Sequence, residues 1–189
     1  MDRAEILALL KKNVTNKNLF KHCLAVEAIM RGTAIRLNER ASTEADPGEW
    51  AIAGLVHDID YDATSDKPEE HSIRGAQMLE EFGFEQDIIY AVKAHNDIHG
   101  FELISPMDIA LFAADPLSGL IVAAALITPD RKLKSIDSQF VLNRFREKLF
   151  ARGAKREQIL QCERLGFSLE EFIEIGLKSM KEIDSEIGL

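Results

Sequence analysis

Cysteine is scarce in this 189-residue sequence, which contains only Cys23 and Cys162, far apart along the chain. Two such cysteines argue against a disulfide framework and against a thiolate zinc site, and they favour a reducing compartment. Long hydrophobic runs are also missing, because the longest strongly apolar one, residues 120–127, is too short to cross a bilayer. The first residues alternate in charge and lack the apolar core of a signal peptide. We therefore expect a cytoplasmic protein with no membrane partner.

The sequence has fewer positively than negatively charged residues: 23 Lys and Arg against 32 Asp and Glu, which gives a net charge of −9. A protein that binds the phosphate backbone of a nucleic acid needs a basic surface, so we expect no nucleic-acid partner. A small anionic substrate would have to meet positive charge locally, and bound metal ions are one source of it. The content of 46% hydrophobic and 29% charged residues is that of a globular protein. The length predicts one domain over residues 1–189.

Helical patterns run through most of the sequence, and no convincing strand or hairpin emerges, so the predicted fold class is all-α. Asn16 is a suitable cap for a long helix that runs to about Arg40. Residues 41–48 are polar and are expected to form a loop. A helix over residues 49–58 carries no charge between its ends, which indicates burial. Residues 61–70 form a second expected loop.

The later helices are predicted from their start and stop signals. Two helices fit residues 71–82 and 85–95. Ser105 and Pro106 begin another, and Pro116 is expected to end it and to begin a further helix that runs to about residue 128. The C-terminal extension, residues 138–189, is predicted to form helices over 138–151 and 155–165. A final helix begins with the capping box Ser168-x-x-Glu171.

The candidate chemistry lies in the placement of histidine. Four of the five histidines occur in or beside apolar helical segments: His22, His57, His71 and His95. Asp58 directly follows His57, and Asp115 follows an apolar helix. Imidazole and carboxylate together suit divalent metals such as Mn, Fe, Ni, Co or Zn. Adjacent residues of a helix point about 100° apart, so a His-Asp pair needs ligands from other helices to close a site.

Each of these residues also has an ordinary interpretation when taken alone. His22 fits a partly exposed helix position. His71 fits the start of a helix, and His95 fits a helix end, where its charge suits the helix dipole. Asp115 before a proline has the pattern of an N-cap. The combination with a buried His-Asp pair favours a metal site.

The order His22, His57-Asp58, Asp115 resembles the HD superfamily of metal-dependent phosphohydrolases, which is named for the His-Asp dyad. Residues 52–62, Ile-Ala-Gly-Leu-Val-His-Asp-Ile-Asp-Tyr-Asp, are similar to the family's buried helix and the motif that ends it. The resemblance covers residues 17–125, about the whole metal-binding core of the family. It implies an HD-domain helical bundle, to which the C-terminal helices are added.

Two further segments, one beginning at His71 and one ending at His95, resemble those of family members that hold two metal ions. The resemblance therefore implies a dinuclear centre. One ion would be bound by His22, His57, Asp58 and Asp115, and the second by Asp58, His71 and His95, with Asp58 as the bridge. The implied cofactors are two divalent transition metal ions (Mn, Fe, Ni, Co or Zn), with Mg as a further candidate.

The resemblance also implies a reaction, the hydrolysis of a phosphate mono- or diester of a small, nucleotide-like molecule by metal-activated hydroxide. Asp58, the implied bridge, and Asp62 are the implied catalytic residues. Asp62 matches a family acid four residues after the dyad's aspartate. Asp62 would orient the dyad or handle a proton.

One position departs from the family's pattern. Many relatives have a lysine three residues after the dyad's aspartate, where this chain has Tyr61, so contacts with the substrate phosphate must come from elsewhere. Arg74, Lys93 and Arg131 are the predicted substrate-binding residues. A basic stretch in the C-terminal extension, which includes Lys155, is either another source of such contacts or ordinary helix surface.

Two other functions remain open. Some HD-fold enzymes hold a di-iron pair with the same six ligands and activate dioxygen, so the ligand set does not separate oxygenase from hydrolase. A sensor that binds a nucleotide without cleaving it is the third hypothesis. The missing Gly-Tyr-Pro signature argues against a cyclic-di-GMP phosphodiesterase of the HD-GYP type. The expected partner is a small phosphorylated substrate, and a homo-oligomer is an open possibility.

Overall fold

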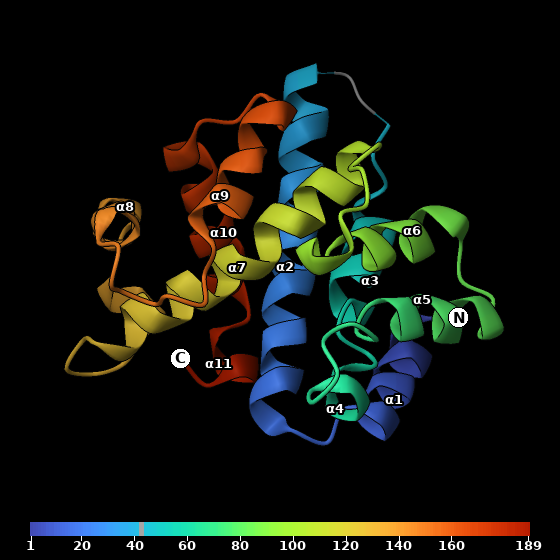
Figure 1. The fold of residues 1–189 in the computed structure, drawn as a ribbon. Helices are drawn as coiled ribbons and strands as arrows, with labels where there is room; N and C mark the ends of the chain where they lie inside the picture. Colours follow the sequence, from blue (N-terminus) through green and yellow to red (C-terminus); the bar gives the residue numbers. More distant parts are fainter. Residues whose placement is uncertain (42–43) are drawn as a thin grey trace.

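The computed structural model describes residues 1–41 and 44–189, and within these ranges it contains helices and turns but no strand. The all-α fold class is therefore confirmed. Residues 42 and 43 of the loop expected over 41–48 lie outside the described residues. The long helix α2 (Lys17–Ala41) passes through the middle of the molecule, and α7 (Pro106–Leu126) crosses it (Figure 1).

The helices at the start of the chain are fixed by their caps. The side chain of Asn16 accepts hydrogen bonds from the backbone N–H groups of Asn18 and Leu19, as the sequence predicts for the start of α2. The sequence analysis missed α1 (Arg3–Asn13), although Asp2 and Glu5 form a capping box at its start. This box was the available signal for α1.

Helix α3 (Pro47–Val56) packs closely against α2 because Gly54 lies at the contact. A Cβ atom at residue 54 would lie 2.7 Å from the carbonyl oxygen of Val26, so only glycine fits there. Trp50 and Leu55 are buried on the same helix, which confirms the burial expected from its lack of charge. The close approach brings the end of α3 next to the first half of α2.

Pro116 does not end a helix, which corrects the sequence expectation. Helix α7 continues from Pro106 to Leu126 with Pro116 inside it. Proline removes one backbone hydrogen bond from a helix interior, but the neighbouring Leu117, Leu120 and Ile121 are each 0% exposed. Burial of these side chains against the other helices outweighs the lost hydrogen bond.

Length and composition alone would allow α7 to cross a membrane, and no other helix of the described chain meets both conditions. Its most apolar stretch is 61% buried within the fold, and core helices commonly have this character. This finding is weak evidence for a membrane span.

The remaining helices are shorter. Their bounds are α4 (Tyr61–Thr64), α5 (Ile73–Glu81), α6 (Gln86–Ala94), η1 (Asp97–His99), η2 (Leu133–Ser135), α8 (Ser138–Arg146), α9 (Arg156–Ile159), η3 (Leu160–Leu165), α10 (Leu169–Glu182) and α11 (Asp184–Ile187). Three expectations need correction: the loop at 61–70 contains α4, the helix at 138–151 ends at Arg146, and the helix at 155–165 is divided between α9 and η3. Helix α10 packs against α2 and α7.

Candidate metal centre

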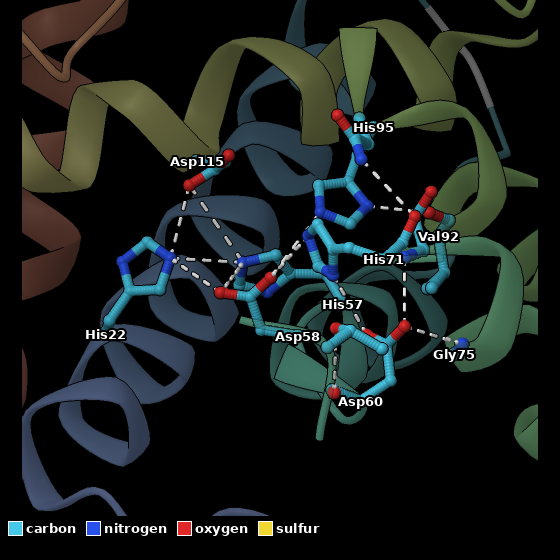
Figure 2. Close-up of polar contacts among 12 residues, drawn as sticks. His22, His57, Asp58, Asp60, His71, Gly75, Val92, His95 and Asp115 are labelled. Atoms are coloured by element: carbon cyan, nitrogen blue, oxygen red, sulfur yellow. Dashed lines mark hydrogen bonds and ion pairs between the residues drawn. The ribbon is translucent and has the colours of Figure 1, made fainter. Parts of the chain in front are cut away.

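Six side chains from different helices and turns converge on one region beside the crossing of α2 and α7 (Figure 2). His22 comes from the first half of α2, and Asp115 comes from the middle of α7. His57 and Asp58 follow the end of α3, His71 precedes α5, and His95 follows the end of α6. The structure therefore brings together all six ligands that the family resemblance implied.

Asp58 lies between two pairs of histidines. Its Oδ2 atom is 3.4 Å from Nε2 of His57 and 3.6 Å from Nε2 of His22. Its Oδ1 atom is 3.3 Å from Nε2 of His71 and 3.5 Å from Nε2 of His95. One carboxylate oxygen thus faces each pair, which is the arrangement that a carboxylate bridging two ions requires.

Backbone carbonyl groups fix the orientation of two of the imidazole rings. Nδ1 of His57 donates to the carbonyl oxygen of Gly54 at 2.8 Å, and Nδ1 of His95 donates to that of Val92 at 2.6 Å. A carbonyl oxygen only accepts, so each Nδ1 carries the hydrogen. In the neutral rings, Nε2 then presents its lone pair to the cluster.

The orientation of His22 follows from the hydroxyl group of Ser118. This hydroxyl donates its single hydrogen to the carbonyl oxygen of Asp115 at 2.8 Å. It therefore accepts from Nδ1 of His22, which lies 2.9 Å away. Nε2 of His22 faces the cluster and lies 3.2 Å from Oδ1 of Asp115. Nε2 of His57 is 3.1 Å from Nε2 of His22, so the lone pairs of these two nitrogen atoms would meet unless a proton or metal ion lies between them.

The donor set fits divalent metal ions. Three groups have ligand atoms within 4.8 Å of one another: His22, His57 and Asp58; His57, His95 and Asp115; and Asp58, His71 and His95. Nitrogen and oxygen donors of this kind bind Mn, Fe, Co, Ni and Zn. The first and third groups correspond to the two ions that the family resemblance implied.

Burial and neighbouring charges shift the pKa values of His57, Asp58 and Asp115. Burial disfavours the charged form of His57, but the adjacent Asp58 carboxylate and then Asp115 outweigh it and raise the pKa of His57 to about 9. Burial would also raise the pKa values of Asp58 and Asp115. His57, His95 and His22 instead lower that of Asp58 well below its ordinary value, and His22 and His57 lower that of Asp115.

Asp60 is a residue of the site that the sequence analysis missed. Its side chain is buried, and its Oδ1 atom accepts from Nδ1 of His71 at 3.0 Å. Its Oδ2 atom accepts from the backbone N–H groups of Ser72 and Gly75, each at 2.9 Å. Asp60 therefore orients the ring of His71 as carbonyl groups orient those of His57 and His95. The available signal was only an acid two residues after the dyad, in a segment that also contains Asp62.

Asp62 lies in α4, and its carboxylate group contacts the residues that precede α2. Its Oδ2 atom accepts from the backbone and hydroxyl groups of Thr15 and from the backbone of Asn16. These contacts, and not the six-residue cluster, lower the pKa of Asp62 although burial opposes the change. In the described chain, no hydrogen bond or ion pair links Asp62 to the cluster. Its predicted catalytic role stays a prediction.

The three predicted substrate-binding cations also lie outside the cluster's contacts. Arg74 and Arg131 are exposed, and the ammonium group of Lys93 lies 4.6 Å from the centre of the Phe101 ring. No ion pair joins any of the three to the six ligands among residues 1–41 and 44–189. Their roles in substrate binding stay predictions.

A cavity of about 160 Å³ opens beside the cluster. Its lining residues are His71, His95, Asn96, Asp97, Asp115, Pro116, Gly153, Lys155 and Gln158. The last three belong to the C-terminal extension, so this part of the chain forms one wall. A larger hollow of about 570 Å³ lies between α2 and α10, but none of the six ligands lines it. The smaller cavity is the one placed for chemistry at the cluster.

Comparisons with known proteins identify a family for this arrangement. A family model described as the HD domain matches residues 19–120, which include all six ligands. An uncharacterized protein of Methanocaldococcus jannaschii is 30% identical over 95 residues, which are 50% of this chain and 54% of that protein. Ribonuclease Y of Oleidesulfovibrio alaskensis is 29% identical over 104 residues, which are 55% of this chain and 18% of that protein. The chain thus spans about half of the first relative and less than a fifth of the second. No solved structure matches it.

Proposed function

Because the chain belongs to the HD-domain family, we propose that it is a metal-dependent phosphohydrolase that cleaves a phosphate mono- or diester of a small, nucleotide-like molecule. The position of Asp58 supports this proposal most directly, because one of its oxygens faces each pair of histidines. Two divalent ions bound there would lower the pKa of water and neutralise negative charge on a phosphoryl group. We propose transition metals (Mn, Fe, Co, Ni or Zn), with Mg as a further candidate.

The protein's own contribution is a ligand set held in place before metal or substrate binds. The rings of His57 and His95 are fixed by carbonyl groups, and that of His71 is fixed by the Asp60 carboxylate. Contacts of this kind set ring orientation and raise ligand basicity, so they support both metal affinity and activity. Asp58 is 6% exposed and His57 is 0% exposed, which limits competition from water at these ligands.

The size of the cavity and the charge of the protein favour a small substrate. Sites for drug-sized ligands usually have volumes of about 300–1,000 Å³, whereas this cavity has about 160 Å³. It is open to solvent and has room for the phosphoryl end of a substrate. One relative is named a ribonuclease, but the net charge of −9 disfavours binding along an RNA backbone. We propose a small phosphorylated substrate in the cytoplasm.

Metal analysis followed by assays on a panel of phosphate esters tests the proposal. The purified chain is loaded with Mn, Co, Ni, Fe or Zn and assayed on nucleoside monophosphates, dinucleoside polyphosphates, cyclic dinucleotides and short RNA. Asp58→Ala should abolish metal binding and substrate cleavage together, whereas Asp66→Ala changes an exposed aspartate and should leave both intact. RNA cleavage alone would replace the proposed substrate class. An iron pair that consumes dioxygen with an organic substrate, without cleavage of any compound of the panel, would establish the oxygenase alternative.

A further inference from the structure

The cavity beside the candidate metal centre has a positively charged side chain in its lining. Among its lining residues, all of which the structure describes, Lys155 is the one lysine or arginine. It comes from the C-terminal extension and lines the same cavity as His71, His95 and Asp115. The position of the family's common lysine is held here by Tyr61, whose ring packs edge-on against His71.

The backbone that carries Lys155 is held in place by the next residue. The guanidinium group of Arg156 donates hydrogen bonds to backbone carbonyl oxygens at the end of α8 and in the turns that follow this helix. Those carbonyl groups belong to Arg144, Phe145, Glu147, Phe150, Ala151 and Ala154. Six contacts to one rigid cation fix the path of the turn, so Lys155 extends from a defined position at the cavity.

The ammonium group of Lys155 is paired with Asp97 of η1. Its Nζ atom lies 2.7 Å from Oδ1 and 2.5 Å from Oδ2 of that residue. The two side chains are 51% and 38% exposed, and an ion pair with that much access to water contributes little to stability. Breaking this ion pair therefore costs little free energy when an anion that binds lysine more strongly enters the cavity.

From this geometry we propose that Lys155 binds the phosphate group of the substrate. The phosphate would then replace the Asp97 carboxylate as the partner of the lysine. The proposal rests on the proposed phosphohydrolase function and adds the cation that the sequence pattern lacks. A phosphate dianion offers a charge-assisted contact stronger than that with a solvated carboxylate. Asp97 holds the lysine over the cavity until phosphate arrives and competes with phosphate for it.

The test measures binding of inorganic phosphate to the metal-loaded full chain by isothermal titration calorimetry. Lys155→Met should weaken phosphate binding about tenfold to a hundredfold, which is the usual value of one hydrogen bond to a charged group. Lys155→Arg should restore most of the affinity. Lys148→Met is the matched control, because it removes the same charge from an exposed position of the same segment. Asp97→Asn should bind phosphate at least as tightly as the unchanged protein.

Three results of the phosphate titration would overturn this proposal: no measurable phosphate binding by the unchanged protein, equal affinities for the two methionine variants, or weaker binding by Asp97→Asn. The ester assay, run in parallel, separates this proposal from the proposed function. Ester hydrolysis with an unchanged KM in Lys155→Met would refute the role of Lys155 alone. Phosphate binding that depends on Lys155, with no ester cleaved, would support the binding site and refute the hydrolase.

Discussion

Asp60 accepts a hydrogen bond from Nδ1 of His71 through one carboxylate oxygen and two backbone N–H bonds through the other. Three donors thus converge on one buried acid. Gly75 allows this approach, since a Cβ atom there would lie 3.1 Å from Oδ1 of Asp60. The backbone of Ser72, next to His71, has a positive φ of 69° and is held in that conformation by the same carboxylate. Asp60 therefore fixes the orientation of the His71 ring and the conformation of the adjacent backbone at Ser72.

Asp60→Asn is expected to weaken binding of the second metal ion about 10–100-fold, the usual effect of removing a contact that orients a ligand. Asparagine has the same shape but only one accepting oxygen for the three donors. Asp62→Asn is the control from the same segment and should leave metal affinity unchanged, because its contacts lie at Thr15 and Asn16. Competitive titration with a chromophoric chelator gives both affinities. Equal affinities in the two variants would show that Asp60 does not act on the metal site.

The raised pKa of His57 predicts that metal binding releases a proton. In the metal-free protein its pKa is about 9, so the ring is charged at pH 7, whereas a metal ligand must be neutral. The apparent metal affinity should therefore rise by up to about tenfold per pH unit until about pH 9. Calorimetry at pH 7 in two buffers of different ionisation enthalpy gives the number of protons released. Zero protons would contradict this charge state of His57.

The same pKa shift predicts how the stability of the metal-free protein depends on pH. The folded pKa of about 9 exceeds the ordinary value of 6.5, so the charged ring stabilises the fold fully below pH 6.5. This contribution is lost as pH rises to about 9. The midpoint temperature of thermal unfolding of the chelator-treated protein should therefore decrease as the pH rises from 6.5 to about 9. His57→Gln, which cannot titrate, should show a smaller fall over the same range.

The six side chains that the structure brings together could be predicted because their spacing is a pattern of residue types. His57-Asp58 after an uncharged helix, with histidines before and after it in a fixed order, can be recognised without coordinates. The contacts that orient the ligands are different in kind. Ser118 and the carbonyl group of Gly54 come from helix interiors, and nothing in their local sequence distinguishes them from other helix residues. Lys155 lies 60 residues beyond His95 in the sequence and reaches the cavity only through the packing of the C-terminal extension.

The error in the fold prediction at Pro116 arises because tertiary packing overrides a local signal. Pro116 is a strong local reason to end a helix, yet α7 continues through it because nearly every side of this helix is buried. The correction also matters for the site. Asp115 is not an N-cap before a new helix but a mid-helix residue whose carboxylate meets His22.

Gly54→Ala is expected to destabilise the protein by about 1–3 kcal/mol, the usual cost of adding a methyl group to a packed core. The new Cβ atom would lie 2.7 Å from the carbonyl oxygen of Val26 and 2.9 Å from the backbone nitrogen of Glu27, and neither can move without shifting α2. Gly119→Ala is the matched control in α7, where the new atom meets nothing within 4 Å. It should stabilise by about 0.5–1 kcal/mol because alanine favours helix. Urea unfolding measures both, and equal effects would contradict the close contact between α2 and α3.

Replacement of both His71 and His95 by alanine is expected to reduce bound metal from about two equivalents to about one. These histidines face Oδ1 of Asp58, whereas His22 and His57 face Oδ2, so their loss removes the nitrogen donors of one ion only. The reciprocal variant, with His22 and Asp115 replaced by alanine, should lose the other ion. Metal content is measured by plasma mass spectrometry after gel filtration, with circular dichroism to establish that the helices persist. Two equivalents in the His71/His95 variant would exclude these residues as ligands, and loss of all metal from either variant would show that the two ions do not bind independently.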